Sequence, residues 1–442
     1  MPAKSATTDE HHHQQPGPKR SAHPKTTTPR TERPPRVIGA FPDDPDQSRP
    51  GPALIVTAAL HGNEPAGINA AKAVLRKLNE HANPSRFRGS VTCIIGNTRA
   101  LERSVRFIHE DLNRHFTPAN LQRAPELQSR AAKDPHAPLL AEDRELIELR
   151  TAITRAVARK NPPGAPRRTP PTTAALLDLH TTSSETHPFL FTEDQTRCRK
   201  IAARIPVITC LGGEPHLKGL LADWFNETLG PAFIFEAAKH NDSRAPARHE
   251  AAIWLTLHAL RMLPPGRTRN NARAAHKLLK AIDEHDPHVL EIRHRHPVKE
   301  GDRFTMRPGF ANFQPVRKGD HLADDKKGFI HAPRSGRIFM PLYQPQGEDG
   351  FFIAKRMSKP FLTASTAARA LALHRLANAL PGVSRRHPPP GSPPIDAFSV
   401  SPRIARLARR QIFALLGYRR TGQHKGSIIF ARTPTDLYRA TR

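Results

Sequence analysis

Residues 53–64 read Ala-Leu-Ile-Val-Thr-Ala-Ala-Leu-His-Gly-Asn-Glu. The stretch 53–60 is largely apolar and unbroken, which predicts a strand. Residues 66–80 follow, and their apolar side chains recur at helical spacing, at Ile68, Ala71, Val74, Leu75 and Leu78. A strand that leads through a short polar turn into an amphipathic helix is typical of α/β folds, so this stretch predicts one.

The same alternation continues along the chain. Short runs rich in β-branched and apolar residues predict further strands at 90–95, 174–179, 206–209 and 232–235. A second helical pattern covers 247–262. The predicted fold class is therefore α/β, with a largely parallel or mixed sheet flanked by helices.

Changes in composition divide the chain into four parts. Residues 1–35 are rich in Pro, Thr, Lys, Arg and His without apolar periodicity, and we expect a disordered tail there. Residues 36–265 form the predicted α/β domain. Short runs punctuated by Pro and Gly predict a small all-β domain over 288–357. Residues 361–442 are expected to form a basic, partly helical extension.

Two segments interrupt this scheme: the first is expected to be a surface excursion, and the second marks a domain boundary. Residues 118–172 contain a polar helical stretch near 139–159 and a Pro-rich linker at 161–171, which indicates a surface excursion. Residues 263–287 begin with Pro264-Pro-Gly266 and continue as a charged connector. In the extension, the pattern predicts helices over 362–380 and 403–417.

The charge of the chain is strongly positive and unevenly distributed. The formal net charge is +29 over 442 residues. The last part of the chain, 351–442, carries 17 Lys and Arg residues against Asp396 and Asp436 as acidic residues. A charge excess of this kind is compatible with binding to a nucleic acid or another polyanion through the C-terminal extension.

Cysteine usage and hydropathy indicate the class of protein. The three cysteines show no CxxC pair, so neither a disulfide framework nor a thiolate zinc site is expected. The N-terminus lacks the apolar segment of a signal peptide, and no stretch approaches the ~20 apolar residues of a membrane span. We therefore expect a soluble, cytoplasmic protein. The sequence leaves open whether it forms a homo-oligomer.

Three polar residues at predicted strand ends have the character of metal ligands. His61 and Glu64 flank the turn after the first strand, where both can reach one small cation. His180 ends another strand, and Asp178 points to the same side of that strand because side chains alternate with period two. Two His and one Glu, with a position open for water, are typical of a hydrolytic zinc site, and Asp178 can orient an imidazole from behind.

Further charged residues are candidates for substrate chemistry. Asp111-Leu-Asn-Arg114 follows Arg106 and, further back, Asn97-Thr-Arg99. An arginine beside an asparagine can bind a carboxylate, and another arginine can polarise a carbonyl. Glu236 closes the apolar run 233–235, where burial would raise its pKa toward that of a general base.

These motifs, HGNE, NTRA, DLNR, DLHTTS and a glutamate that ends a late strand, occur in that order. The chain thereby resembles the succinylglutamate desuccinylase/aspartoacylase family, relatives of the zinc carboxypeptidases, over roughly 53–260 and more loosely over 288–357. The resemblance implies a zinc-carboxypeptidase-like fold with one zinc ion per chain, bound by His61, Glu64 and His180. The implied reaction is hydrolysis of an N-acyl amino acid to a carboxylate and an amine.

The resemblance also implies roles for the remaining candidates. Glu236 activates the attacking water, and Arg106 polarises the scissile carbonyl. Asn113 and Arg114 hold the α-carboxylate of the substrate. Arg99 is as compatible with bracing Asp111 or Asp178 as with contacting substrate.

The sequence departs from aspartoacylases where those enzymes hold the side chain of aspartate. Residues 217–226 contain no arginine, with Lys218 as a less directional substitute. In the expected tyrosine region, 347–352, only Tyr343 lies near. N-acetylaspartate is therefore not the expected substrate. Two alternatives to the deacylase stay open: a zinc carboxypeptidase acting on short peptides, and an inactive relative that binds polyanions through its C-terminus.

Overall fold

The computed structural model describes residues 33–134, 138–158, 174–213, 217–282, 288–386, 396–402, 411–424 and 426–432. The predicted tail lies outside these ranges except for residues 33–35, and so does the whole predicted linker at 161–171. Within the described ranges, no helix has the length and apolar character needed to cross a membrane. Cys93, Cys198 and Cys210 are buried and form no disulfide.

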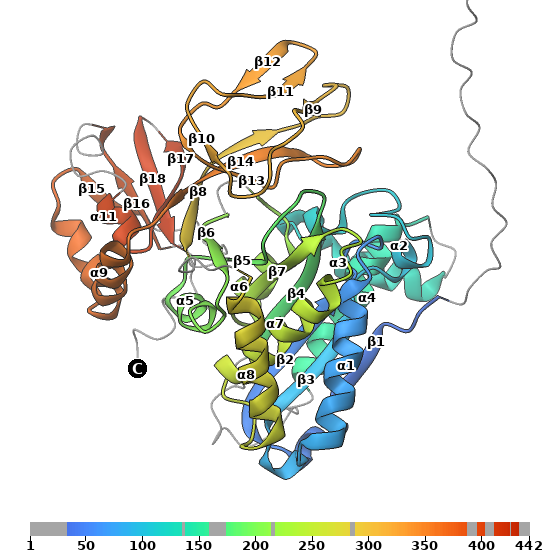
Figure 1. The fold of residues 1–442 in the computed structure, drawn as a ribbon. Coiled ribbons are helices and arrows are strands. Elements are labelled where there is room, and N and C mark those ends of the chain that lie inside the picture. Colours follow the sequence, from blue (N-terminus) through green and yellow to red (C-terminus); the bar gives the residue numbers. More distant parts are fainter. Residues whose placement is uncertain are drawn as a thin grey trace, which may run out of the picture. The chain divides into compact units, whose positions relative to one another are not determined.

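The described residues contain an eleven-stranded mixed sheet, in the order β1-β3-β2-β4-β7-β5-β6-β8-β14-β13-β10 (Figure 1). Its centre consists of four parallel strands: β3 (Arg88–Ile95), β2 (Arg49–Ala58), β4 (Ala174–Thr182) and β7 (Ala232–Lys239). The strand β1 (Val37–Phe41) pairs antiparallel with β3. Next to β7 lie the antiparallel β5 (Phe189–Thr192) and then β6 (Ile208–Leu211). The predicted α/β class is confirmed.

Helices cover both faces of this sheet because the central strands are apolar on both. In β2, Leu54 and Val56 face α1 (Ala66–His81) and α7 (Ala245–Ala259), whereas Ile55 faces the opposite layer. The helix α8 (Arg267–Lys280) packs on α7, on the near side in Figure 1. The opposite layer contains α4 (Ala141–Ala158) and α6 (Leu221–Thr228). The shorter helices are α2 (Thr98–Glu102), α3 (Pro118–Lys133) and α5 (Thr196–Ala202).

Both the predicted surface excursion and the predicted connector contain a helix that packs into the core. In α4, Leu146, Leu149 and Ile153 are fully buried against the sheet, so the expected surface excursion is wrong for this helix. The charged connector predicted at 263–287 contains α8, whose Ala272 and Leu279 join the apolar layer of α1 and α7. Both helices look polar in sequence because their buried stripes are narrow.

The segment 288–357 is rich in strands, as predicted, and it continues the central sheet. The strand β8 (Val289–Pro297) pairs with β6, and the sheet then continues through β14 (Asp349–Arg356), β13 (Gly336–Phe339) and β10 (Pro315–Val316). A smaller sheet comprises β9 (Thr305–Met306), β11 (His321–Asp325) and β12 (Gly328–His331). The strands that follow the α/β part are thus joined to it by backbone hydrogen bonds.

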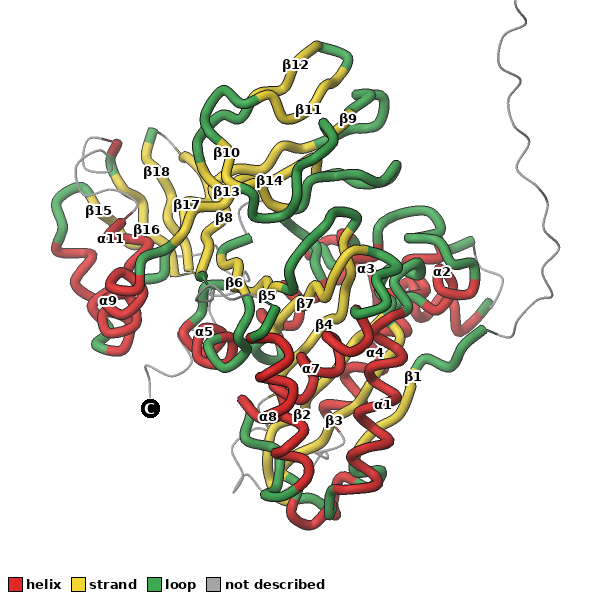
Figure 2. The backbone as a smooth tube through the Cα atoms, viewed as in Figure 1, coloured by secondary structure: helices red, strands yellow, loops and turns green. Residues whose placement is uncertain are grey.

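The C-terminal segment contains a sheet that the sequence analysis missed (Figure 2). Helix α9 (Lys359–Ala370) and the 3-10 helix η4 (Leu373–Ala379) correspond to the helix predicted over 362–380. The second predicted helix, 403–417, lies partly outside the described residues, which contain α11 (Gln411–Leu415). Four antiparallel strands complete the segment: β15 (Val383–Arg386), β16 (Asp396–Val400), β17 (Arg419–His424) and β18 (Ser427–Arg432).

Candidate active site

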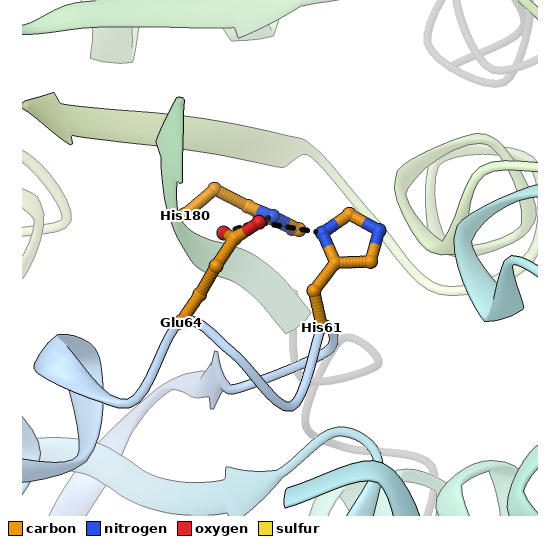
Figure 3. A group of neighbouring side chains, drawn as sticks. All are labelled: His61, Glu64 and His180. Atoms are coloured by element: carbon orange, nitrogen blue, oxygen red, sulfur yellow. Dashed lines mark hydrogen bonds and ion pairs between the residues drawn. The ribbon is translucent and has the colours of Figure 1, made fainter. Parts of the chain in front are cut away.

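The three predicted metal ligands converge at the carboxyl end of the parallel strands. His61 and Glu64 lie on the loop between β2 and α1, and His180 lies on β4 (Figure 3). One carboxylate oxygen of Glu64 is 2.9 Å from His61 Nδ1, and the other is 3.2 Å from His180 Nδ1. All three side chains are buried, and their donor atoms lie within 4.8 Å of one another. This arrangement fits a single divalent cation.

The loop that carries His61 leaves the sheet sharply. Ala59 adopts a left-handed conformation with φ of 53°, which turns the chain out of β2. At Gly62, a Cβ atom would lie 2.1 Å from the carbonyl carbon of Ala100, so only glycine allows the loop to press against α2. The small residues of this turn therefore position His61 and Glu64 above the sheet.

Two aspartates orient the imidazoles through the ring nitrogens that do not face Glu64. Asp178 Oδ2 is 2.8 Å from His180 Nε2, and its other oxygen accepts a hydrogen bond of 2.6 Å from Thr57. Asp111 Oδ1 is 3.0 Å from His61 Nε2. In both rings Nε2 is engaged, so Nδ1 is the nitrogen that faces Glu64. Asp178 lies where the sequence placed it, whereas the role of Asp111 was missed, although it is the first residue of the DLNR motif.

The charges of these groups depend on one another. Burial disfavours charge on Glu64, but the imidazoles of His61 and His180 hold the pKa of its carboxyl group well below the usual range. Burial likewise opposes charge on His180, yet Asp178 and Glu64 raise the pKa of its imidazole well above the ordinary value. An ionised Glu64 between two imidazoles supplies the oxygen and nitrogen donors that zinc accepts.

Glu236 lies on β7 directly beside His180, because the two residues are register partners in the parallel β4–β7 pair. Its side chain is buried, and burial raises the pKa of Glu236 to about 8. Among the described residues, its Oε2 atom has no hydrogen-bond partner. A buried carboxylate with one unsatisfied oxygen beside a ligand cluster is well placed to exchange a proton with a bound molecule.

The predicted substrate-binding residues are distributed around this centre. A guanidinium nitrogen of Arg106 lies 3.5 Å from Glu64, and another donates a 2.9 Å hydrogen bond to Asp111. The side-chain oxygen of Asn113 accepts from the backbone N–H of Leu221 at 3.0 Å, at the start of α6. Arg114 donates to Asp349 Oδ2 of β14 at 2.6 Å. Arg106 and Arg114 thus face the site, whereas the Asn113 oxygen is engaged by α6.

The residues whose roles the sequence left undecided lie elsewhere. Arg99 donates to Glu145 at 2.6 Å and to Glu148 at 2.8 Å, both on α4, and therefore braces neither Asp111 nor Asp178. The hydroxyl of Tyr343 donates to the carbonyl of Arg307 at 2.8 Å. Neither Tyr343 nor Lys218 is among the residues that line the cavity at the site.

That cavity is small, about 70 Å³. One wall is formed by the metal-ligand cluster with Arg106, Asp111 and Glu236. The opposite wall is formed by the segment that leads into β14: Met340, Leu342, Gln344, Gly347, Glu348 and Asp349. A cavity of this volume suits a small molecule.

A comparison with known protein families tests the resemblance that the sequence motifs indicate. Residues 50–138 match the model of the succinylglutamate desuccinylase/aspartoacylase catalytic domain. The predicted resemblance is confirmed. The matched range includes the HGNE, NTRA and DLNR motifs of the family, while His180 and Glu236 lie beyond it.

Solved structures similar to this chain include two succinylglutamate desuccinylases and an aminoacylase. Succinylglutamate desuccinylase from Vibrio cholerae is 14% identical with a TM-score of 0.46, over 69% of this chain and 82% of that chain. The desuccinylase from Chromobacterium violaceum is 16% identical with a TM-score of 0.46, over 71% and 88%. Murine aminoacylase 3 is 15% identical with a TM-score of 0.44, over 70% and 96%.

Proposed function

We propose that the protein hydrolyses the amide bond of a small N-acylated amino acid or related acylated amine, with one zinc ion per chain. The observation that carries this proposal is the buried cluster of His61, Glu64 and His180 with the unsatisfied carboxylate of Glu236 beside it. The match to the desuccinylase/aspartoacylase catalytic domain supports the same chemistry.

His61, Glu64 and His180 would hold the ion through two nitrogen atoms and one oxygen atom. When bound, zinc supplies Lewis-acid polarisation of the scissile carbonyl, acidifies the attacking water and favours the charged form of nearby carboxylates. Asp111 and Asp178 fix the two imidazoles, so that their Nδ1 atoms face Glu64.

Glu236 would act as general base and then as general acid. Its free oxygen accepts a proton from the attacking water and later passes that proton to the departing nitrogen, which leaves as an amine. Arg106 would donate a hydrogen bond to the oxygen on which negative charge develops, because Asp111 holds its guanidinium toward the cluster.

The small cavity favours this function over cleavage of peptides. A peptidase needs an open cleft for an extended chain, whereas residues of the segment 340–349 and the metal-ligand cluster line a cavity of about 70 Å³. The described part of the C-terminal extension is attached to the α/β part, since Arg369 of α9 donates to Asp194 at 3.0 Å. These contacts favour a small-molecule deacylase over the two alternatives.

The first test combines metal content with amine release. We expect the purified protein to carry one zinc ion per chain and to release amine from some members of a panel of N-acetyl and N-succinyl compounds. His61→Ala should lose both metal and activity, whereas His81→Ala, at the surface end of α1, should retain both. A protein that binds no zinc, or that keeps full activity after His61→Ala, would contradict the proposal.

A further inference from the structure

His240 connects the metal-ligand cluster to the opposite wall of the cavity. It follows β7 directly and lies among the lining residues, as does Thr181. The backbone N–H of Thr181 donates a 2.8 Å hydrogen bond to Glu64 Oε2, and its hydroxyl is 2.8 Å from His240 Nδ1. On its other side, His240 Nε2 is 3.2 Å from Gln344 Oε1, in the segment that leads into β14. Hydrogen bonds therefore run from a metal ligand through His240 to Gln344.

The partners of His240 define where its ring carries a proton. The side-chain oxygen of Gln344 only accepts hydrogen bonds, so the Nε2 atom that faces it carries a proton and donates. In the neutral ring, Nδ1 then accepts from the Thr181 hydroxyl. The amide nitrogen of Gln344 has no hydrogen-bond partner among the described residues. Because Gln344 lines the cavity, this donor is available to a bound molecule.

The backbone around Gln344 is held by polar contacts to the loop after β4. The buried Asn312 donates to Ser184 Oγ at 2.9 Å and accepts from the backbone N–H of Met340 at 2.5 Å. Gln344 is thus restrained through its side-chain oxygen and through the neighbouring backbone. Such restraint lowers the cost of ordering the side chain when a molecule binds.

His240 and the two arginines of the lining lie on opposite sides of the ligand cluster. The sheet order β3-β2-β4-β7 places the ligands after β2 and on β4. Arg106 and Arg114 belong to the segment after β3, whereas His240 follows β7. The family resemblance implies that Arg114 holds the α-carboxylate of the substrate. With the scissile amide at the cluster, the acyl group then extends toward His240 and Gln344.

We propose that Gln344 is a specificity-determining residue that donates a hydrogen bond to an oxygen of the acyl chain beyond the scissile carbonyl. His240 is the positioning residue that orients this donor. An acyl chain with such an oxygen satisfies the Gln344 amide, whereas an apolar chain of the same length leaves it without a partner. The inference rests on the proposed deacylation and defines the acyl groups that the site prefers.

Two acyl groups that differ in one atom test this contact. Methoxyacetyl has an ether oxygen where butanoyl has a methylene group, and both are joined to the amine that the first panel releases fastest. The measured quantity is the kcat/KM of the methoxyacetyl compound divided by that of the butanoyl compound, which we call the acyl ratio. Comparing this ratio between proteins cancels the intrinsic reactivity of the two compounds.

Gln344→Leu removes the donor at similar side-chain volume. We expect the acyl ratio to fall about three- to tenfold from its wild-type value, as for the loss of one hydrogen bond. Cleavage of the butanoyl compound should change little. Gln346→Leu, an exposed change in the same segment and outside the lining, should keep the wild-type ratio. An unchanged ratio in Gln344→Leu would overturn the inference.

Two substitutions of His240 separate positioning from a merely structural role. His240→Phe keeps a planar ring without a donor, so the acyl ratio should fall as in Gln344→Leu while bound zinc is retained. His240→Gln keeps a donor at the place of Nε2 and should recover part of the ratio. Combining His240→Phe with Gln344→Leu should lower the ratio no further, because His240 acts through Gln344. A wild-type ratio in His240→Phe would remove its positioning role.

A binding measurement separates this inference from the proposed function. Methoxyacetate and butanoate carry the same two chains, and NMR titration of each into zinc-loaded and zinc-free protein requires no turnover. In a protein that cleaves none of the compounds, tighter binding of methoxyacetate to wild type but not to Gln344→Leu would disprove the deacylase and keep the contact. Equal affinities of the two acids, or no binding, would then remove both. In an active enzyme, an unchanged acyl ratio in Gln344→Leu removes the contact alone.

Discussion

Glu236 is the residue at which catalysis and metal binding can be separated. It lies beside His180 but is not part of the ligand cluster, and one of its oxygens is unsatisfied. We expect Glu236→Gln to keep bound zinc and to lower kcat by about 10²–10⁴-fold, the usual contribution of a general base. Metal analysis and steady-state kinetics on the same preparation test this. A tenfold loss or less would assign proton transfer to another group.

Arg106 is expected to act on the developing oxyanion. Replacing it with alanine should lower kcat by about 10²–10³-fold, by analogy with the loss of an oxyanion-hole donor. Arg106→Lys retains the charge without the two-donor geometry and should recover part of the rate. If Arg106→Ala mainly raised KM at unchanged kcat, the side chain would serve ground-state binding instead.

His249 makes the stability of the fold sensitive to acid. Its Nε2 atom donates a hydrogen bond of 2.9 Å to the carbonyl of His180, and burial lowers the pKa of His249 to about 4 from an ordinary value of 6.5. Between these two values the unfolded chain binds a proton that the folded chain does not. The neutral His249 therefore contributes its full share of the folding stability above pH 6.5. This share, roughly 3 kcal/mol, is lost as the pH falls toward 4.

Denaturant unfolding between pH 4 and pH 7 measures this loss. In the wild-type protein, the free energy of unfolding should fall as the pH is lowered from 7 to 4, because unfolding lets His249 take up one proton. The variant His249→Gln should lack this part of the slope, whatever its absolute stability. The surface variant His81→Gln should keep it. An identical slope in wild type and His249→Gln would show that other groups carry the acid sensitivity.

At the scale of elements, α4 is attached to the sheet through buried charge as well as apolar contacts. Glu145 is fully buried and accepts hydrogen bonds from the backbone of Thr98, at the start of α2, and from Arg99 and Arg36. Such a carboxylate satisfies the free N–H groups of a helix start and compensates two cations. The polar sequence of α4 therefore reflects an internal ion cluster, not a surface helix.

Removal of this charge should be costly. We expect Glu145→Gln to lower the free energy of unfolding by about 3 kcal/mol, because Arg36 and Arg99 each lose the more deeply buried of their two carboxylate partners and keep only Glu148. Glu148→Gln, in the same helix but 34% exposed, should cost less than about 1 kcal/mol. Chemical denaturation of both variants gives the comparison. Equal effects would mean that burial of Glu145 adds nothing to the interaction.

The sequence predicted those elements whose apolar pattern is broad. The strand at 53–60 and helix at 66–80 were recognisable because they are apolar on both faces or along a wide stripe. The helices α4 and α8 were misjudged because their few buried apolar residues stand among charges. The C-terminal sheet was missed because its strands are short and arginine-rich, as in β17. Tertiary contacts decide such elements, and local pattern does not.

For the whole molecule, a buried arginine connects the C-terminal segment to the α/β part. Arg369 is 3% exposed at its side chain and donates to the backbone and the carboxylate of Asp194, at 2.6 and 3.0 Å. It also contacts the carbonyl of Leu415 at 3.4 Å. The pair thus joins α9 and α11 to the segment between β5 and α5.

We expect Arg369→Met to loosen this attachment, because Asp194 would be left buried with one cation fewer. Limited proteolysis should cut the variant several-fold faster after residue 357, while the α/β part stays intact. The exposed substitution Arg386→Met in β15 should not change the cleavage rate. Equal rates for wild type and Arg369→Met would show that other contacts hold the segment.

The site was more predictable than the fold around it. His61 and Glu64 follow β2, while His180 and Glu236 lie toward the ends of β4 and β7, and these neighbouring parallel strands end at one edge of the mixed sheet. Short sequence motifs were therefore enough to predict that these four side chains lie close together. The pairing of Arg114 with Asp349 joins residues 235 positions apart, and no local pattern encodes such a contact.

The backbone ladder from β6 through β8 to β14 connects the two sides of the site. Asp349 begins β14, which is hydrogen-bonded to β8, so this part of the wall is anchored in the central sheet. The sheet that carries His180 and Glu236 thus also carries a residue that bounds the space beside them.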